Sequence, residues 1–177
     1  SAELPERGLV WVTGPSGKGK SQLLQAIAGL EASRGSRAYA GQVLSPGLVS
    51  GWLYLEQQPL VMAATLKHNL CLGQSFRHTE LEHALVTVGL SYLSEPGEWL
   101  GPGGRQLSGG ERKRLNIARA LLHGGPVWLV DEPFEGLDSE AASLIMSVLQ
   151  MSAKDRLVVI ASHVIPEHTR PALTLRL

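Results

Sequence analysis

A short β-rich run, a glycine-rich loop and an amphipathic helix follow one another near the start of the chain. This order restricts the fold more than any other feature. The run is Gly8–Thr13, the loop is Gly14–Ser21, and the helix is expected to begin near Gly19. Its apolar face is expected to carry Leu23, Leu24, Ile27 and Leu30. A strand that enters a helix through a tight loop is typical of parallel sheets covered by helices, so the sequence predicts an α/β fold.

The loop itself fits the phosphate-binding pattern G-x-x-x-x-G-K-S. Its glycines let successive backbone N–H groups point inward toward phosphate oxygens. Lys20 would reach the β- and γ-phosphates, and the Ser21 hydroxyl would ligate Mg²⁺. Lys18 is expected to face solvent and receives no individual role. The loop residues expected to contact a nucleotide are Gly14, Pro15, Ser16, Gly17, Lys18, Gly19, Lys20 and Ser21.

The later segments continue the alternation of strands and helices. The continuous apolar run Pro126–Asp131 is typical of a strand buried on both faces of a parallel sheet. Further strands are expected at 52–55 and 157–161, with an edge strand at 172–175, and further helices at 109–122 and 139–151. The sequence therefore predicts a P-loop type core of residues 1–57 and 105–177.

Residues 58–104 are expected to form a helical lobe inserted into this core. Thr79 and Glu82 predict a helix start, with an apolar face formed by Leu81, Leu85 and Val88. The segment 95–104 is dense in glycine and proline and is expected to be a loop. Together the two parts would make a single domain over residues 1–177.

Composition excludes several classes of protein. Sixteen basic residues balance sixteen acidic ones, whereas nucleic-acid binding usually needs a basic excess, so no nucleic-acid partner is expected. The single cysteine, Cys71, lies in an apolar run and is expected to be buried and free of disulfides. No apolar run reaches membrane-spanning length, and Ser1–Pro15 lacks a signal-peptide pattern. A soluble, cytosolic chain without direct membrane insertion is expected.

A second glycine-rich turn, Leu107–Glu111, opens the predicted helix at 109–122. Ser108 can cap this helix, and Glu111 is placed to reach back to the Ser108 N–H. Gly109 and Gly110 have no side chains, so a phosphate could approach the positive end of the helix dipole. An ordinary capping box without a ligand is the alternative interpretation of this turn.

Two acids, Asp131 and Glu132, end the apolar strand. The first is placed to hold Mg²⁺, directly or through water, and the second to accept a proton from the water that attacks the γ-phosphate. A pair of surface acids after a strand is the alternative. Asp138 follows shortly and can cap the next helix, a role that can coexist with a functional one.

Two more polar residues lie near predicted strand ends. Gln57 could reach a metal ion or water with its amide oxygen, although a solvated glutamine is common at such a position. His163 follows the strand 157–161 at its carboxyl end, where ligands of open α/β sheets bind. A γ-phosphate contact and a structural or exposed histidine are equally open for His163.

In order and approximate spacing, these segments resemble the ATP-binding cassette (ABC) family. Gly14–Ser21 resembles the Walker A loop, Leu107–Glu111 the signature sequence, and Asp131-Glu132 the Walker B motif with its catalytic glutamate. Gln57, Asp138 and His163 look like the residues of the Q-loop, D-loop and H-loop. The resemblance implies that two cassettes pair head to tail, with each Mg²⁺-bound ATP between the Walker A loop of one and the signature of the other. It assigns catalysis to Glu132, His163 and Gln57, metal binding to Ser21, Gln57 and Asp131, and nucleotide contacts to Ser108, Gly109, Gly110 and Asp138.

A finer resemblance is to exporter cassettes, carried by Gln57–Pro59 followed by Ala64–Leu70. Trp99–Leu107, together with Glu132–Asp138, is similar to one subfamily in particular, the heterodimeric bacterial cysteine and glutathione exporter required for cytochrome bd assembly. This implies ATP hydrolysis that powers export, with a membrane-spanning domain as partner on the cytoplasmic side of a bacterial inner membrane. The cassette would be N-terminally shortened, without the upstream aromatic residue that stacks on adenine. The alternatives are a soluble ABC-type ATPase of DNA repair or translation and a nucleotide-binding fragment with little activity alone.

Overall fold

The computed structural model describes residues 3–31, 36–93, 95–163 and 169–177. The chain divides into two compact units. The first, called the sheet unit here, comprises Ser1–Glu56, Gly125–Pro133 and Leu149–Leu177. The second, called the helical unit, comprises Gln57–Gly124 and Phe134–Val148.

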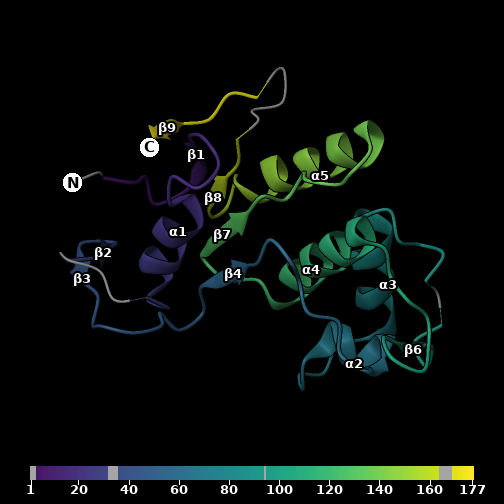
Figure 1. Cartoon of the computed structure of the whole chain (residues 1–177). Coiled ribbons are helices and arrows are strands. Elements are labelled where there is room, and N and C mark those ends of the chain that lie inside the picture. The colour runs from purple at the N-terminus through teal and green to yellow at the C-terminus, as the bar shows by residue number, and fades with distance from the viewer. Residues whose placement is uncertain (1–2, 32–35, 94, 164–168) are drawn as a thin grey trace. The chain divides into compact units, whose positions relative to one another are not determined.

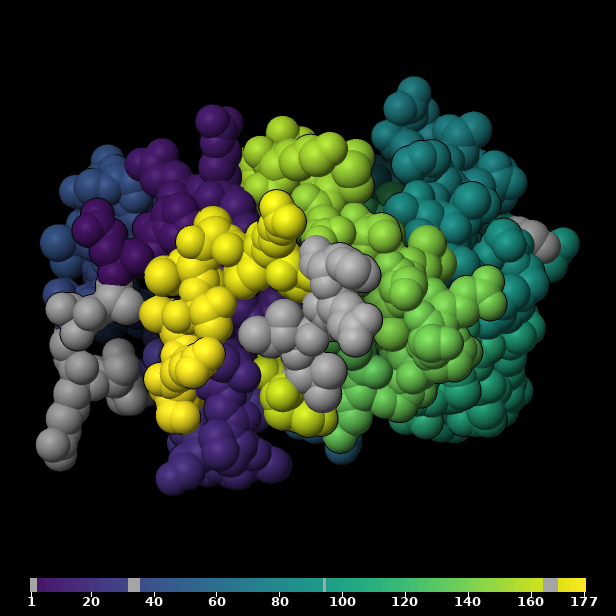
Figure 2. All heavy atoms as spheres, turned by 90° about the horizontal axis from the view of Figure 1, so that it is seen from above, coloured from purple at the N-terminus to yellow at the C-terminus, as the bar shows by residue number. Residues whose placement is uncertain are grey.

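A five-stranded parallel sheet forms the centre of the sheet unit (Figure 1). Its strand order is β4-β7-β8-β1-β9, with bounds Leu53–Leu55 (β4), Val127–Asp131 (β7), Leu157–Ala161 (β8), Gly8–Thr13 (β1) and Leu173–Arg176 (β9). β9 lies at the edge, as expected for the last strand. In Figure 2 the C-terminal segment (yellow) lies beside the N-terminal one (purple), in agreement with the pairing of β9 and β1. Since all strands are parallel, their carboxyl ends meet at one edge of the sheet.

The central strands are buried because helices cover apolar side chains on the sheet. Every residue of β7 and β8 is buried, and Val10, Trp11 and Val12 of β1 are fully inaccessible. The helix α1 (Lys20–Ala28) contributes Leu24 and Ala28 to this core. Together with the parallel sheet, this arrangement confirms the predicted α/β fold.

The expectation for Leu30 was wrong. The helix α1 ends at Ala28 because Gly29 adopts a left-handed C-cap with φ 81°. Leu30 therefore lies beyond the helix and is 48% exposed. A short antiparallel pair, β2 (Ala38–Tyr39) and β3 (Gln42–Val43), follows in the same unit.

The helical unit is built on α2 (Leu66–Cys71), α3 (His78–Thr87) and α4 (Gly109–His123). It thus takes in α4, which lies outside the range 58–104 expected for the helical lobe. The helix α5 (Ser139–Ser152) begins in this unit and ends in the sheet unit. None of the helices in the described part of the chain combines the length and the hydropathy of a membrane-spanning segment.

Local structure in the helical unit differs from expectation at two places. The helix α3 begins after Arg77, whose backbone N–H donates to Glu80 Oε2 at 2.7 Å, so the predicted start at Thr79 with Glu82 was wrong. The predicted loop at 95–104 contains the two-residue strand β6 (Trp99–Leu100), paired antiparallel with β5 (Ala64–Thr65). Cys71 is buried and free, as expected. The predicted apolar residues Leu81 and Leu85 of α3 are buried, and so is Val88, the C-cap of this helix.

Candidate nucleotide-binding site

The phosphate loop runs from the carboxyl end of β1 into α1, as the sequence predicts. Gly17 and Gly19 adopt left-handed conformations with φ 77° and 86°, which side chains with a Cβ rarely adopt. Residues 15–18 are exposed, so the loop is accessible to a ligand. Ser21 lies in the first turn of α1, next to Lys20. The loop therefore has the backbone form needed for an anion cradle at a helix N-terminus.

Lys20 turns back toward its own loop. Its side chain is 6% exposed, and Nζ donates to the carbonyl oxygens of Gly14 at 3.0 Å and Pro15 at 3.3 Å. The same ammonium lies 3.5 Å from Glu132 Oε1. Lys20 and Glu132 thus form an ion pair in the sheet unit, although they belong to separate motifs 112 positions apart in the chain.

Glu132 lies immediately after β7 in an unusual backbone conformation. Its φ is 41°, in the left-handed region, and its N–H donates to Ala161 O of the neighbouring strand at 2.8 Å. The side chain is buried, and Oε2 lies 3.1 Å from His163 Nδ1. His163 is about half exposed. The structure therefore brings Lys20, Glu132 and His163 together at the carboxyl edge of the sheet.

Asp131 is the last residue of β7 and is only 3% exposed. Tyr54 Oη donates a hydrogen bond to its Oδ2 at 3.1 Å. The other oxygen, Oδ1, is buried and has no hydrogen-bond partner among the described residues. A buried carboxylate oxygen needs a donor or a cation, so this atom fits the role of holding Mg²⁺ or its water. Burial, followed by the charge of Asp131, raises the pKa of Tyr54 and keeps its hydroxyl protonated as a donor.

The second glycine-rich turn forms the predicted capping box at the start of α4. Ser108 Oγ accepts from the Glu111 N–H at 3.1 Å, and Glu111 Oε2 accepts from the Ser108 N–H at 2.7 Å. A Cβ on Gly109 would meet nothing within 4 Å, whereas one on Gly110 would lie 3.0 Å from Leu137 Cδ2. Gly109 thus leaves open space at the helix N-terminus, while Gly110 permits close packing of the segment before Asp138.

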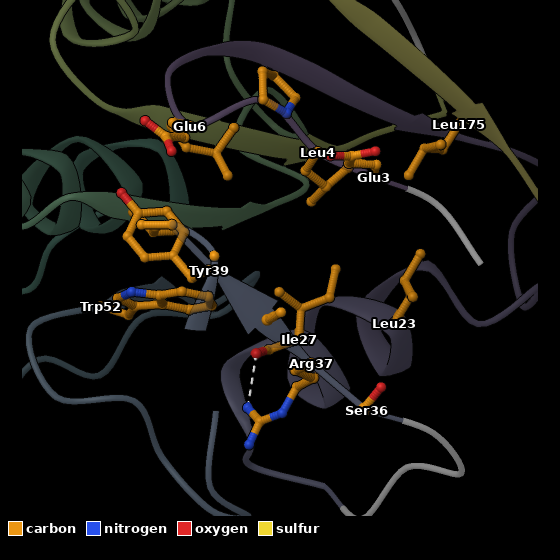
Figure 3. A pocket seen from close by; sticks show the side chains of 16 residues that line it. Glu3, Leu4, Glu6, Leu23, Ile27, Ser36, Arg37, Tyr39, Trp52 and Leu175 are labelled. Carbon is orange, nitrogen blue, oxygen red and sulfur yellow. Dashed lines mark hydrogen bonds between the residues drawn. The ribbon is translucent and has the colours of Figure 1, made fainter. Parts of the chain in front are cut away.

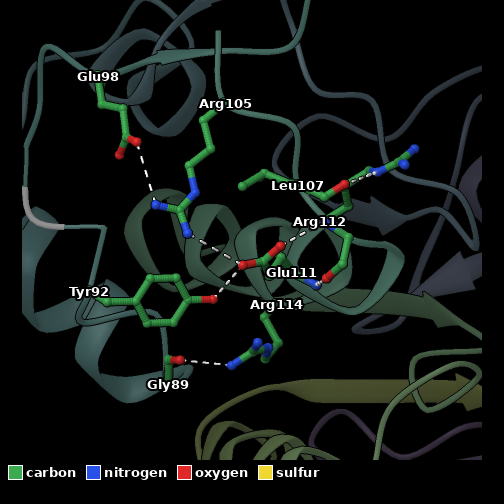
Figure 4. A network of polar contacts seen from close by, with 9 residues as sticks. Gly89, Tyr92, Glu98, Arg105, Leu107, Glu111, Arg112 and Arg114 are labelled. Atoms are coloured by element: carbon green, nitrogen blue, oxygen red, sulfur yellow. Dashed lines mark hydrogen bonds and ion pairs between the residues drawn. The ribbon is translucent and has the colours of Figure 1, made fainter.

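Glu111 is held by more than the capping box (Figure 4). Its Oε1 accepts a hydrogen bond from Tyr92 Oη at 2.6 Å and lies 3.7 Å from an Arg105 nitrogen. Arg105 also pairs with Glu98 at 3.5 Å. Burial opposes ionisation of Glu111, but the hydrogen bonds from Tyr92 and Ser108 outweigh it, and its pKa is lowered. The turn is therefore fixed by a network of side chains that the sequence alone does not reveal.

Gln57 has a partner inside the helical unit. Its Nε2 donates to Glu135 Oε2 at 2.8 Å, and the same oxygen lies 3.5 Å from Lys113 Nζ on α4. Asp138 caps α5, since its Oδ1 accepts from the Ala141 N–H at 2.8 Å. The capping role foreseen for Asp138 is thus confirmed. Its contact with nucleotide stays a prediction, as does that of Gln57 with metal.

A cavity of about 560 Å³ also lies in the sheet unit (Figure 3). It is lined by α1 side chains such as Leu23 and Ile27 and by Val127 and Leu157, which are the first residues of their strands. The Tyr39 and Trp52 rings meet there edge to face, with centroids 5.4 Å apart. No residue of the phosphate loop 14–21 lines this cavity. It is therefore separate from the candidate nucleotide site at the carboxyl edge.

Sequence reasoning missed the partners of the predicted residues: Tyr54 beside Asp131, Glu135 and Lys113 beside Gln57, and Tyr92 and Arg105 beside Glu111. None of these side chains belongs to a motif with a fixed spacing. Only the strand register and the tertiary arrangement of loops and helices bring them into contact.

The parallel sheet, the glycine-rich cradle and the acids at the end of β7 define a P-loop nucleotide-binding protein. The ABC transporter family model matches residues 1–135, so the chain belongs to the ABC transporter family. A solved bacterial Atm1-family ABC exporter with ATP bound shares the fold, with a TM-score of 0.79 and 23% identity over 88% of this chain and 30% of that one.

Relatives of this chain include transporter subunits of different kinds. The glutathione/L-cysteine transport system ATP-binding/permease protein CydC of Escherichia coli (strain K12) is 39% identical over 86% of this chain and 28% of its own length. CydC of Haemophilus influenzae is 34% identical, over 91% of this chain and 30% of its own length. The thiamine import ATP-binding protein ThiQ of Vibrio vulnificus (strain YJ016) is 32% identical over 89% of this chain and 70% of its own. The chain thus spans less than a third of the CydC proteins.

Proposed function

We propose that the chain is the ATP-hydrolysing cassette of a membrane exporter. The observation that supports this most is the cluster in the sheet unit in which Glu132 lies between Lys20 and His163. A general base must be within hydrogen-bond reach of its proton and held in place by neighbours. Glu132 meets the second condition through two partners and a fixed backbone conformation.

The residues around the phosphate loop would bind Mg²⁺ and ATP. Lys20 would exchange its bonds to Gly14 O and Pro15 O for the β- and γ-phosphate oxygens. Ser21 and Asp131 would hold Mg²⁺, with the unpartnered Asp131 Oδ1 as acceptor. The metal ion would neutralise charge on the phosphates.

Glu132 would then act as the base. Moving Lys20 to the phosphates removes its charge from Glu132 Oε1, which leaves that oxygen able to accept a proton from the attacking water. His163 would orient Glu132 Oε2 and contact the γ-phosphate from its half-exposed position. Gln57 would complete the site after leaving Glu135.

Ser108, Gly109 and Gly110 would serve the ATP of a second cassette in a head-to-tail dimer, together with Asp138. The open space at Gly109 and the capped start of α4 support this role, since a phosphate needs free N–H groups at a helix N-terminus. A monomer would accordingly hydrolyse ATP poorly.

The names of the relatives support a proposal for the membrane domain and the substrate class. CydC and CydD proteins are named for glutathione and L-cysteine transport, and a CydD of Haemophilus influenzae is 31% identical over 91% of this chain. We therefore propose small thiols as the exported class and a bacterial inner membrane as the location. The helical unit would contact the membrane-spanning domain from the cytoplasmic side.

Replacing Glu132 with glutamine tests this proposal. In the transporter that carries the cassette, Glu132→Gln should lower steady ATP turnover by about 100-fold or more while ATP binding persists. The isolated Glu132→Gln chain should dimerise when ATP is added, measured by light scattering. The exposed Glu95→Gln is the matched control and should retain full turnover. Normal turnover by Glu132→Gln would show that Glu132 is not the base.

A further inference from the structure

Tyr54 lies beside the candidate metal site, and no motif explains its presence there. It is the middle residue of β4, opposite Leu129 in the parallel register with β7. Side chains two residues apart on a strand share one face of the sheet, so Tyr54, Leu129 and Asp131 project toward the same side. A tyrosine is long enough to cover the diagonal distance, and its hydroxyl reaches Asp131 Oδ2 at 3.1 Å.

The two oxygens of Asp131 differ in their surroundings. Oδ2 accepts the Tyr54 hydrogen bond, while Oδ1 is buried and without a partner among the described residues. A carboxylate with one oxygen held by a fixed donor cannot rotate freely about its last bond. Its second oxygen is therefore directed before any cation arrives, which lowers the cost of ordering the ligand.

We propose that Tyr54 is a positioning residue for the metal ion: its hydrogen bond to Oδ2 holds the Asp131 carboxylate so that Oδ1 is directed toward Mg²⁺. This rests on the proposed function, since it assumes that Ser21 and Asp131 hold the cation. The alternative is a tyrosine that only satisfies its own hydroxyl within the fold.

The two alternatives differ in how strongly Mn²⁺ improves ATP binding. Isothermal titration of the chain with ATP, once with Mn²⁺ and once with EDTA, gives the ratio of the two affinities. Tyr54→Phe should lower this ratio by about 10-fold or more, because partners of metal ligands typically contribute 10–100-fold to metal affinity. ATP affinity in EDTA should stay unchanged, since the phosphate loop does not depend on the hydroxyl.

One further variant separates alignment from general destabilisation. Tyr39→Phe makes the same change at a ring of the sheet unit whose hydroxyl has no hydrogen bond among those described, and it should keep the wild-type ratio.

The outcomes distinguish the two proposals. A wild-type chain that does not bind ATP more tightly with Mn²⁺ contradicts the proposed function and this inference with it. If Mn²⁺ strengthens ATP binding equally in the wild-type chain and in Tyr54→Phe, the role of Tyr54 is contradicted and the proposed function is left intact. Equal loss of ATP affinity with and without Mn²⁺ identifies a purely structural role and also overturns the inference.

Discussion

Replacing Asn69 with alanine should destabilise the helical unit more than any surface change. Asn69 is fully buried in α2 and binds the segment that follows Gln57. Its Oδ1 accepts from the Met62 N–H at 2.9 Å and from Arg119 Nη2 at 3.0 Å. Its Nδ2 donates toward the carbonyl oxygens of Met62, Ala64 and Thr65 at 3.0–3.3 Å.

The size of the effect follows from these bonds. The two hydrogens on Nδ2 allow two full bonds to the three carbonyls, so the side chain makes four bonds, one of them with a charged donor. Neutral bonds contribute about 0.5–1.5 kcal/mol each and charged ones about 1.5–3 kcal/mol. Allowing for water that enters the space left by Asn69→Ala, we expect a loss of about 3–5 kcal/mol in the free energy of unfolding. That is a large part of the roughly 5–15 kcal/mol typical of a domain.

Urea unfolding followed by tryptophan fluorescence measures this loss. Asn116→Ala is the matched control, because Asn116 lies half-buried on α4 and has no side-chain hydrogen bond among those described. It should change stability by less than about 0.5 kcal/mol. A loss of less than about 1 kcal/mol in the free energy of unfolding for Asn69→Ala would refute the reasoning that these hydrogen bonds stabilise residues 60–65.

Two other variants probe the turn at the start of α4. The pKa of Glu111 lies below its ordinary value of 4.5, so its ionised form stabilises the fold above that pH, and the contribution is lost as the pH falls through the lower, folded-state pKa. Glu111→Gln should therefore make Tm fall less steeply below pH 4.5, whereas the control Glu95→Gln should not. Equal curves of Tm against pH for the two variants would contradict the network in Figure 4. Gly109→Ala meets open space, so Tm should not fall, while ATP turnover in the assembled transporter should drop at least about 10-fold. Unchanged turnover would mean that no phosphate approaches Gly109.

The fold could be predicted from the sequence where one pattern decided the structure. The buried strands β7 and β8 and the helix α4 lie within two residues of their expected bounds, because continuous apolar runs and a capping box are strong local signals. The strand order of the sheet has no such signal and comes only from the structure. Leu30 was misplaced because Gly29 ends α1 although the apolar pattern continues.

The candidate site was predictable in its motifs but not in their partners. Lys20, Glu132 and His163 were each found from their position after a strand or in a loop. Their mutual contacts depend on which strands are neighbours, and so does the hydrogen bond of Tyr54 to Asp131. The contacts of Gln57 and Glu111 were equally unpredictable, since their partners come from other segments of the chain.

The left-handed backbone at Glu132 has a consequence for evolution and engineering. A residue with a Cβ held at φ 41° costs about 1 kcal/mol or more relative to glycine, whether or not a nucleotide is present. Selection for thermal stability alone would therefore favour glycine or asparagine at this position and remove the carboxylate. A library screened only for heat resistance would drift toward inactive proteins here, so a stabilised version of this chain has to keep Glu132 fixed.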